Sequence, residues 1–207
     1  MIFALLPVKA PKNAKQRLSG FFTPEQRERL ARAMFEEVLA TLCAVEGLAR
    51  VVVVTSDEVA AGRARSLGAQ VFEETEQQSH SVSADAAARR AAELGASTVV
   101  LLPIDVPLVT KEEIESLIAG PGPGVIVVPS ADGTGTNALV RTPPGVIESR
   151  FGPGSFRKHI GQAEAACVPV KVLRPSGLLF DIDTPEDIAE LLARAPSSRI
   201  AAFLRSL

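Results

Sequence analysis

The chain has 207 residues, of which 46% are hydrophobic, and its formal net charge at pH 7 is −2. This length predicts one domain over residues 1–207 with enough apolar material for a core. The near-neutral charge argues against a dominant nucleic-acid or anionic-membrane surface, which would need an excess of basic residues. No apolar run approaches the roughly 20 residues of a membrane span, so we expect a soluble cytoplasmic protein that binds neither nucleic acid nor membrane.

Five short apolar runs predict the strands of a sheet. They are residues 2–6, 51–54, 69–72, 98–102 and 125–128. The runs are mostly continuous and rich in β-branched residues rather than alternating, which is typical of parallel strands that helices cover on both faces.

Helix start signals lie between these runs. Residues 23–26 (Thr-Pro-Glu-Gln), 110–113 (Thr-Lys-Glu-Glu) and 184–187 (Thr-Pro-Glu-Asp) each combine a capping threonine with the residues that favour a first helical turn. The Ala-rich stretch 83–94 is also expected to be helical. The alternation of strand and helix predicts an α/β fold with a mostly parallel sheet, in which ligands bind outside the carboxyl ends of the strands.

Three aspartates that follow apolar runs are the candidate metal ligands. Asp181 and Asp183 come after residues 177–180, which we expect to be a strand, and side chains at i and i+2 of a strand share a face. Asp105 ends the apolar run that begins at residue 98, with a turn cap as its alternative role. Because crowded carboxylates need a neutralising cation, and oxygen ligands favour Mg²⁺, the aspartates predict metal-assisted phosphate chemistry.

The loop after the first predicted strand carries four cations in nine residues, Lys9, Lys12, Lys15 and Arg17. It contains neither GxGxxG nor GxxxxGK[ST], which excludes a dinucleotide fingerprint and a Walker loop. These side chains are expected to bind phosphates by charge, and Arg17 also by paired hydrogen bonds. A solvated basic loop is the alternative.

Two segments of small residues are candidate ligand-binding loops. Residues 130–139 follow the last predicted strand and include Thr136 and Asn137, with free amides and hydroxyls that suit an anionic or ribose-bearing ligand. Residues 151–156 (Phe-Gly-Pro-Gly-Ser-Phe) lead into a predicted helix, where Ser155 is the expected cap and free amides suit phosphate or carboxylate. An ordinary turn is the alternative for each segment.

The remaining signals are less specific. The polar stretch 77–83 is either a contact to a nucleotide base or a plain loop, and His159 is expected on the surface rather than at a ligand. Cys43 and Cys167 stand in apolar contexts without a CxxC pair, which predicts reduced, buried thiols and no disulfide framework. The last helical stretch, residues 200–204, is expected to pack on its own domain rather than on a second subunit.

Taken together, these segments resemble the CofC/FbiD family, the guanylyltransferases of deazaflavin coenzyme F-420 biosynthesis, which are similar to the MobA-like nucleotidyltransferases. The matching segments occur in family order at residues 7–9, 14–18, 103–108, 132–139, 151–156 and 181–185. The resemblance implies a Rossmann-like nucleotidyltransferase fold and the Mg²⁺-dependent joining of GMP from GTP to a phosphorylated three-carbon acid, with release of pyrophosphate. Candidate acceptors are phosphoenolpyruvate, 2-phospho-L-lactate and 3-phosphoglycerate.

The resemblance also implies a role for each candidate residue. The catalytic cations would be Lys9, Lys15 and Arg17, the substrate-binding residues Thr136, Asn137, Gly152 and Ser155, and the ligands of Mg²⁺, with two ions expected, Asp105, Asp181 and Asp183. The implied partners are GTP, the phosphorylated acid and a downstream enzyme of the coenzyme pathway. Monomer and homodimer both stay open.

One stretch departs from the family pattern, and two other functions compete with this one. Many relatives carry Leu-Asn-x-Ala after the third strand, whereas residues 81–85 lack that Asn, so guanine contacts are not carried over here. A different MobA-like enzyme, acting on a molybdopterin or a sugar phosphate, would have a Gly-rich first loop, but this loop has no glycine before Gly20. A non-catalytic nucleotide-binding protein would not need three aspartates and a cationic loop.

Overall fold

The computed structural model describes residues 1–10, 15–75, 79–120 and 122–207. Lys12 of the basic loop and Gln77 and Gln78 of the polar stretch lie outside these residues. The strands are β1 (Ile2–Pro7), β2 (Arg50–Thr55), β3 (Gln70–Glu73), β4 (Thr98–Leu101), β5 (Gly124–Pro129), β6 (Thr136–Thr142) and β7 (Val170–Val172). The helices are α1 (Pro24–Ala44), α2 (Glu58–Ser66), α3 (His80–Glu93), α4 (Lys111–Ile118), α5 (Ser155–Ala165), α6 (Pro185–Arg194) and α7 (Arg199–Leu204), with a 3-10 turn at Gln16–Leu18.

The strands of the described residues form one seven-stranded sheet in the order β3-β2-β1-β4-β6-β5-β7. Only β6 runs antiparallel to its neighbours, so the predicted, mostly parallel sheet is confirmed. The five predicted strands correspond to β1–β5 and agree with their bounds to within one residue at either end. The sequence reasoning did not predict β6 and β7 as strands.

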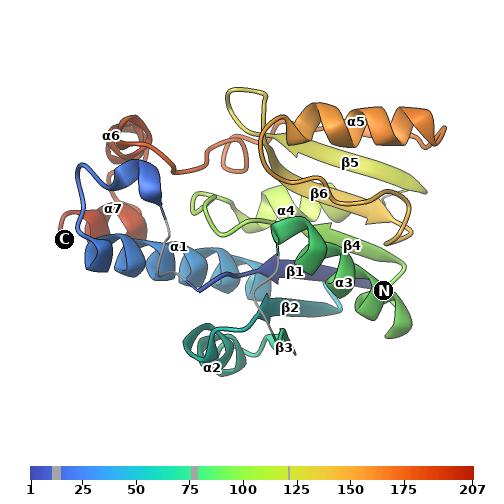
Figure 1. The fold of residues 1–207 in the computed structure, drawn as a ribbon, viewed down its shortest axis with the longest axis horizontal. Coiled ribbons are helices and arrows are strands. Elements are labelled where there is room, and N and C mark those ends of the chain that lie inside the picture. Colours follow the sequence, from blue (N-terminus) through green and yellow to red (C-terminus); the bar gives the residue numbers. More distant parts are fainter. Residues whose placement is uncertain (11–14, 76–78, 121) are drawn as a thin grey trace.

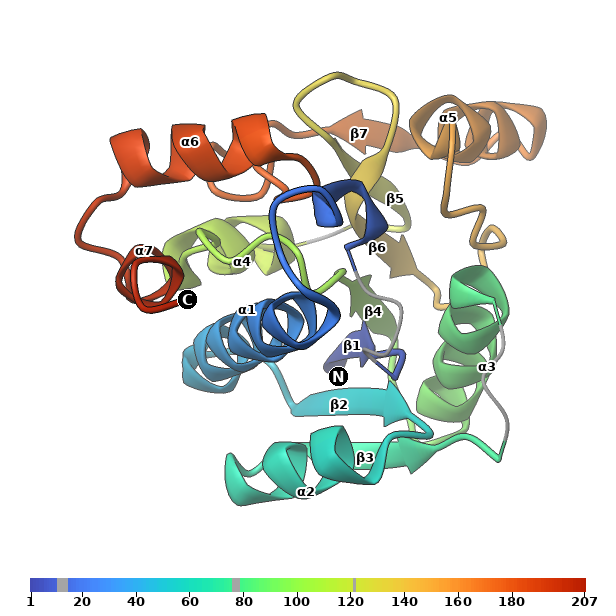
Figure 2. The same cartoon turned by 60° about the vertical axis from the view of Figure 1, so that its left-hand side comes forward.

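Helices cover both faces of the sheet. Helices α1, α2 and α4 lie on one face, and α3 and α5 lie on the other (Figures 1 and 2). Successive residues of β1 serve the two faces in turn, since Ala4 and Leu6 belong to the first core cluster and Phe3 and Leu5 to the second. The continuous apolar runs follow from this arrangement, because each strand must bury both of its faces.

A third apolar cluster lies beside the sheet, where α6 and α7 meet α1. Leu191 of α6 and Ile200 of α7 share it with Leu30 and Met34 of α1. Leu18 also belongs to this cluster and anchors the end of the basic loop. The carboxyl-terminal helix therefore packs on its own chain, as predicted.

The three helix start signals are confirmed. Thr23, Thr110 and Thr184 each form a complete capping box at the start of α1, α4 and α6. The predicted strand at 177–180 is wrong, because this segment forms a turn and the following aspartates lie in irregular backbone. Its apolar residues pack in two different cores. Leu178 belongs to the first cluster and Phe180 to the third, and the third cluster lies beside the sheet, where a strand of the sheet would not reach.

The prediction of buried thiols is also wrong. Cys43 and Cys167 are free and exposed. Cys43 follows the buried Leu42 in α1 and does not belong to the buried face of that helix, and Cys167 lies in the turn after α5 with φ +53°. No helix within the described ranges has the length and apolar character needed to cross a membrane.

Candidate functional site

The predicted site segments meet at one edge of the sheet. β1 and β4 end at this edge, and β6 begins there because it runs in the opposite direction. The loop after β1 therefore lies near Asp105, which follows β4, and near Thr136, which opens β6. The amide of Ile182 donates a 2.9 Å hydrogen bond to the carbonyl of Asp105, so residues 181–183 join the same edge.

Lys15 is the centre of this arrangement. Its ammonium donates to Asp105 Oδ2 at 2.9 Å and to Asp183 Oδ1 at 2.7 Å, and its side chain is only 7% exposed. Burial lowers the pKa of Lys15, but the charges of Asp105 and Asp183 outweigh burial and raise it overall, so the amine is protonated at neutral pH. The residue has φ +52°, a left-handed conformation that costs a non-glycine residue about 1–2 kcal/mol.

Asn137 holds the third aspartate. Its Nδ2 donates to Asp181 Oδ1 at 3.0 Å and to the carbonyl of Leu178 at 2.9 Å. Burial raises the pKa of Asp181; the Asn137 hydrogen bond opposes this rise, and the charges of Asp105 and Asp183 add to it. Asp181 is therefore close enough to the other two aspartates for the three carboxylates to repel one another.

The capping box of α6 fixes the backbone of this aspartate segment. Asp187 Oδ2 accepts from the amide of Asp183 at 2.8 Å and from that of Thr184 at 2.7 Å. The Thr-Pro signal in the sequence thus has two effects. It starts α6, and the capping box fixes the backbone from which the Asp183 side chain extends.

The donor set suits a divalent cation in charge and in chemistry. Two of the three carboxylates contact the Lys15 ammonium, and the third, Asp181, lies near these two. The three carboxylates outweigh this ammonium by two negative charges, which a divalent cation can balance, and carboxylate oxygens are the ligands that Mg²⁺ prefers. Among the described residues, no three Asp, Glu, His or Cys side chains form a group that could hold a metal ion as they stand. The ammonium of Lys15 occupies the space between two of the three carboxylates, so it must leave them before an ion can enter.

The other two predicted cations lie at the rim of the site. The guanidinium of Arg17 is 3.6 Å from Asp183 Oδ2, and its side chain is 73% exposed. Lys9 is exposed and lies near His80. The pKa of His80 is lowered to about 4, mainly by burial; the charge of Asp105 opposes this shift, and that of Lys9 adds to it. Both charged groups are therefore close enough to act on this imidazole.

The second half of the site is formed by Thr136 and the start of α5. Thr136 is buried and its Oγ1 lies 3.0 Å from His159 Nδ1. Gly152 is exposed at φ +105°, and Ser155 is the buried first residue of α5. The amide of Phe156 donates to the carbonyl of Thr134 at 3.2 Å, which joins the helix start to the loop before β6.

Two predictions about this segment are wrong. Gly154, at φ +70°, is the N-cap of α5 rather than Ser155, because the tight turn needs a left-handed residue at that point. The amides of Ser155 and Phe156 are not free, since they donate to the carbonyls of Gly152 and Thr134.

His159 is fully buried, so its predicted surface position is wrong as well. It lies one turn after Ser155 on the face of α5 that also buries Ala163, and its Nε2 accepts a 2.9 Å hydrogen bond from the amide of Arg150. The spacing of four between these three residues was the available sequence signal. Asp85 was missed too, although it is the only acidic residue in the Ala-rich run from 83 to 92.

Comparison with known proteins gives the relatives of this chain. Residues 2–207 match the family described as "Guanylyl transferase CofC like". A phosphoenolpyruvate guanylyltransferase from Rubrobacter xylanophilus is 38% identical, with 93% of this chain and 94% of that protein aligned. A 2-phospho-L-lactate guanylyltransferase from Methanothermobacter thermautotrophicus is 31% identical, with 99% of this chain and 90% of that protein aligned.

A solved structure supports the fold independently. A proposed nucleotide-diphospho-sugar transferase from Desulfovibrio desulfuricans superimposes with a TM-score of 0.79 at 18% identity, covering 99% of this chain and 94% of that one. At this identity the likeness concerns the fold alone, and that fold is the predicted one. From the sequence match and the arrangement of the site, the chain is an enzyme of the nucleotidyltransferase class and belongs to the family of CofC-like guanylyl transferases.

Proposed function

We propose that this enzyme joins GMP from GTP to the phosphate of a phosphorylated three-carbon acid and releases pyrophosphate, as a step of deazaflavin coenzyme F-420 biosynthesis. The names of the relatives support the reaction. The observation that carries the proposal is the buried ammonium of Lys15 between Asp105 and Asp183, because a cation and carboxylates at this edge suit a triphosphate with its metal.

The reaction needs charge neutralisation more than a base. A phosphate oxygen of the acid forms a bond to the α-phosphorus of GTP while the bond to the bridging oxygen of the β-phosphate breaks, so pyrophosphate carries the electron pair away. The acceptor phosphate is already ionised near neutral pH, which makes a general base unnecessary. The barrier arises from repulsion between anions and from charge that builds on the leaving group.

The residues of the first loop supply cations that reduce both the repulsion between the anions and the charge on the leaving group. Lys15 would leave the carboxylates and contact the triphosphate, with Arg17 and Lys9 at the rim of the site. Magnesium, with two ions expected, would be held by Asp105, Asp181 and Asp183 and would supply further neutralisation of the phosphates.

The acid would bind at Thr136, Gly152 and Ser155, with Asn137 next to Asp181 between the two halves of the site. Phosphoenolpyruvate is our first candidate, because the relative at 38% identity carries that name, and 2-phospho-L-lactate is the second. The product would keep a reactive phosphoanhydride, so a downstream enzyme of the pathway must consume it.

The test is pyrophosphate release with GTP and Mg²⁺, with phosphoenolpyruvate, 2-phospho-L-lactate and 3-phosphoglycerate offered separately. ATP and CTP are the nucleotide controls, and Asp105→Asn is the protein control. We expect release with GTP and one acid, and a loss of at least about 100-fold in the variant, since removing a single electrostatic group from such sites has effects of this order. Absence of release from folded wild-type protein with every pair would refute the proposed reaction.

A further inference from the structure

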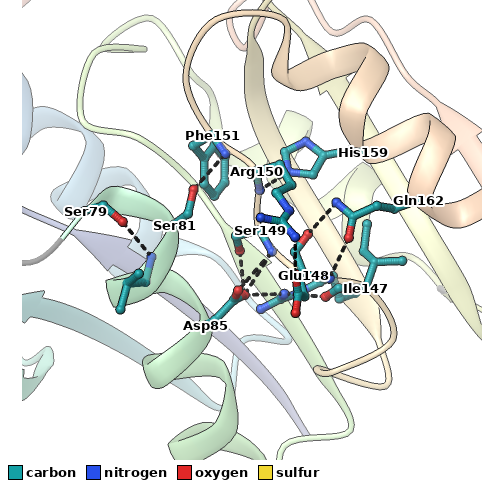
Figure 3. Close-up of polar contacts among 12 residues, drawn as sticks. Ser79, Ser81, Asp85, Ile147, Glu148, Ser149, Arg150, Phe151, His159 and Gln162 are labelled. Carbon is teal, nitrogen blue, oxygen red and sulfur yellow. Dashed lines mark hydrogen bonds and ion pairs between the residues drawn. The ribbon is translucent and has the colours of Figure 1, made fainter.

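Three consecutive backbone amides before the Gly152 turn are each held by a side chain of a flanking helix (Figure 3). Asp85 and Ser81 come from α3, and His159 comes from α5. The hydrogen bonds run from Ser149 N to Asp85 Oδ1 and Oδ2, both at 3.1 Å, from Arg150 N to His159 Nε2 at 2.9 Å, and from Phe151 N to Ser81 Oγ at 2.9 Å. The backbone that leads into the Gly152 turn is therefore fixed from both sides.

The contact with Arg150 determines where the proton of His159 lies. A backbone N–H can only donate, so the Nε2 atom that accepts from Arg150 carries no proton. The imidazole is therefore neutral with its proton on Nδ1, and this N–H donates to Thr136 Oγ1 at 3.0 Å.

The surroundings of the ring agree with a neutral imidazole. His159 is completely buried. Its pKa is lowered to about 4, mainly by burial; the charge of Arg141 adds to this shift, and that of Asp85 opposes it. Phe151 packs edge-on against the ring, with centroids 5.3 Å apart, and helps to keep water from it.

The tautomer in turn fixes the direction of the Thr136 hydroxyl. A hydroxyl has one proton to donate and can accept two hydrogen bonds. Because Thr136 accepts from His159, its own proton stays available for another acceptor. The oxygens of a carboxylate or of an ionised phosphate accept hydrogen bonds. The Thr136 hydroxyl is therefore oriented to donate, as binding of an anion requires. The opposite tautomer would direct the Thr136 proton into the ring and leave lone pairs facing the anion.

We propose that His159 is a positioning residue for the acid substrate: through its Nδ1–H it makes Thr136 a hydrogen-bond donor to an anionic group of the acid, and through Nε2 it anchors the loop that carries Gly152. The identity of the ligand rests on the proposed function. The hydrogen-bond pattern does not, because it follows from contacts within the protein alone.

The first test measures the tautomer in the full-length wild-type protein. Nitrogen-15 NMR of labelled histidine at pH 7 distinguishes the two ring nitrogens, and we expect a neutral His159 with the proton on Nδ1. A proton on Nε2, or an imidazolium, would overturn the proposal whatever the enzyme proves to transfer. His159→Gln and the second histidine, His80, assign the signals.

The second test is a double-mutant cycle on the KM for the acid. Thr136→Val and His159→Gln are each expected to raise this KM about tenfold and to leave the KM for GTP near the wild-type value. The first removes the hydroxyl that donates to the anionic group of the acid, and the second removes the N–H that orients this hydroxyl. His159→Gln keeps an acceptor oxygen near the position of Nε2 for the amide of Arg150, so it changes the contact with Thr136 alone. In the double variant we therefore expect no further rise. His159→Asn, whose amide nitrogen can take the place of Nδ1, is expected to recover part of the affinity.

Gln162→Ala is the matched control. Gln162 lies on the same helix and exchanges two 3.3 Å hydrogen bonds with Glu148, so the variant loosens the same loop without touching Thr136. We expect its KM for the acid to stay near the wild-type value. Independent, additive effects of Thr136→Val and His159→Gln would overturn the proposal, as would an equal rise in Gln162→Ala. Lack of turnover in the wild type would refute the guanylyltransferase reaction, and the NMR result would then decide the tautomer by itself.

Discussion

Lys15 has two competing roles at the scale of the single residue. In the absence of ligand its ammonium neutralises Asp105 and Asp183, and the same ammonium is a candidate phosphate contact. A divalent ion and this ammonium would compete for the same carboxylate oxygens. Binding of the metal should therefore release Lys15 from the carboxylates, which links metal entry to the placement of a cation near the triphosphate.

Lys15→Ala should separate these roles. Removal of the ammonium leaves two partly exposed carboxylates without their partner, so we expect the metal-free variant to lose about 1–2 kcal/mol of unfolding free energy. Mg²⁺ should stabilise the variant more than it stabilises the wild type, because no ammonium has to leave, while turnover should fall at least about 100-fold. Thermal melts with and without Mg²⁺ measure the first effect.

The control for this variant is Lys111→Ala, which removes a surface lysine paired with Glu46 and Glu115. Its melts should show no change in the response to Mg²⁺. If Lys15→Ala responded to Mg²⁺ no more than the wild type does, the two cations would not share a site.

The burial of His159 has a consequence for stability at acid pH. Its pKa is about 4 in the folded protein against 6.5 for the free side chain, so the unfolded chain binds its proton more strongly. The resulting stability is complete above pH 6.5, falls as the pH drops toward 4, and amounts to about 3 kcal/mol. Urea unfolding of wild type and His159→Gln between pH 7 and about pH 4 measures this term. Parallel pH profiles for the two proteins would contradict it.

At the scale of elements, Asp85 couples α3 to β6 and to the loop before α5. Its carboxylate accepts from Arg141 Nη1 at 2.7 Å and from Ser149 Oγ at 2.8 Å. The Arg141 side chain is 1% exposed, and its Nε and Nη2 have no hydrogen-bond partner in the described part of the chain. The negative charge of Asp85 thus offsets the cost of burying the Arg141 guanidinium.

Asp85→Ala should therefore destabilise the fold strongly. The variant would leave the Arg141 charge buried with the Ile147 carbonyl as its remaining acceptor, a change that typically costs about 3–5 kcal/mol. Urea unfolding measures the loss. Glu148→Ala, which breaks an exposed pair with Arg150 in the same segment, should change the unfolding free energy by less than about 0.5 kcal/mol. Similar losses in the two variants would show that burial of the pair is not the cause.

At the scale of the whole molecule, the site joins segments that are far apart in the sequence. Lys15, Asp105 and Asp183 follow β1, β4 and β7, and Thr136 is the first residue of β6. Helices cover both faces of the sheet that these strands form (Figure 2). A ligand that contacts all of these segments binds the folded chain and not the unfolded one. Binding should therefore raise the stability of the entire molecule rather than of one loop.

We expect GTP with Mg²⁺ to stabilise the protein by about 2.7 kcal/mol at 100 times its dissociation constant. Chelation of the metal should remove most of this gain in the wild type. The Asp105→Asn variant should gain little stability from GTP and Mg²⁺, with or without chelator, because the proposed metal site has lost one carboxylate oxygen. Thermal melts across these conditions measure the effect, and a gain that survives chelation would argue against a metal at the aspartates.

The sequence alone determined the elements with strong local causes. The apolar runs of β1–β5 and the capping threonines of α1, α4 and α6 depend on neighbours along the chain, so the strand bounds and helix starts follow directly. The order of site segments also indicated that Asp105 and the basic loop would meet, since parallel strands end at one edge.

Tertiary structure decided what depends on distant partners. Leu178 and Phe180 look like strand residues by composition but are drawn into two separate cores, and Cys43 is exposed because its helix turns that side away from the sheet. His159 is buried because a backbone amide and a threonine hydroxyl satisfy both of its nitrogens. A local pattern can specify backbone conformation and amphipathic faces, whereas the burial of a polar group depends on partners that only the folded chain brings together.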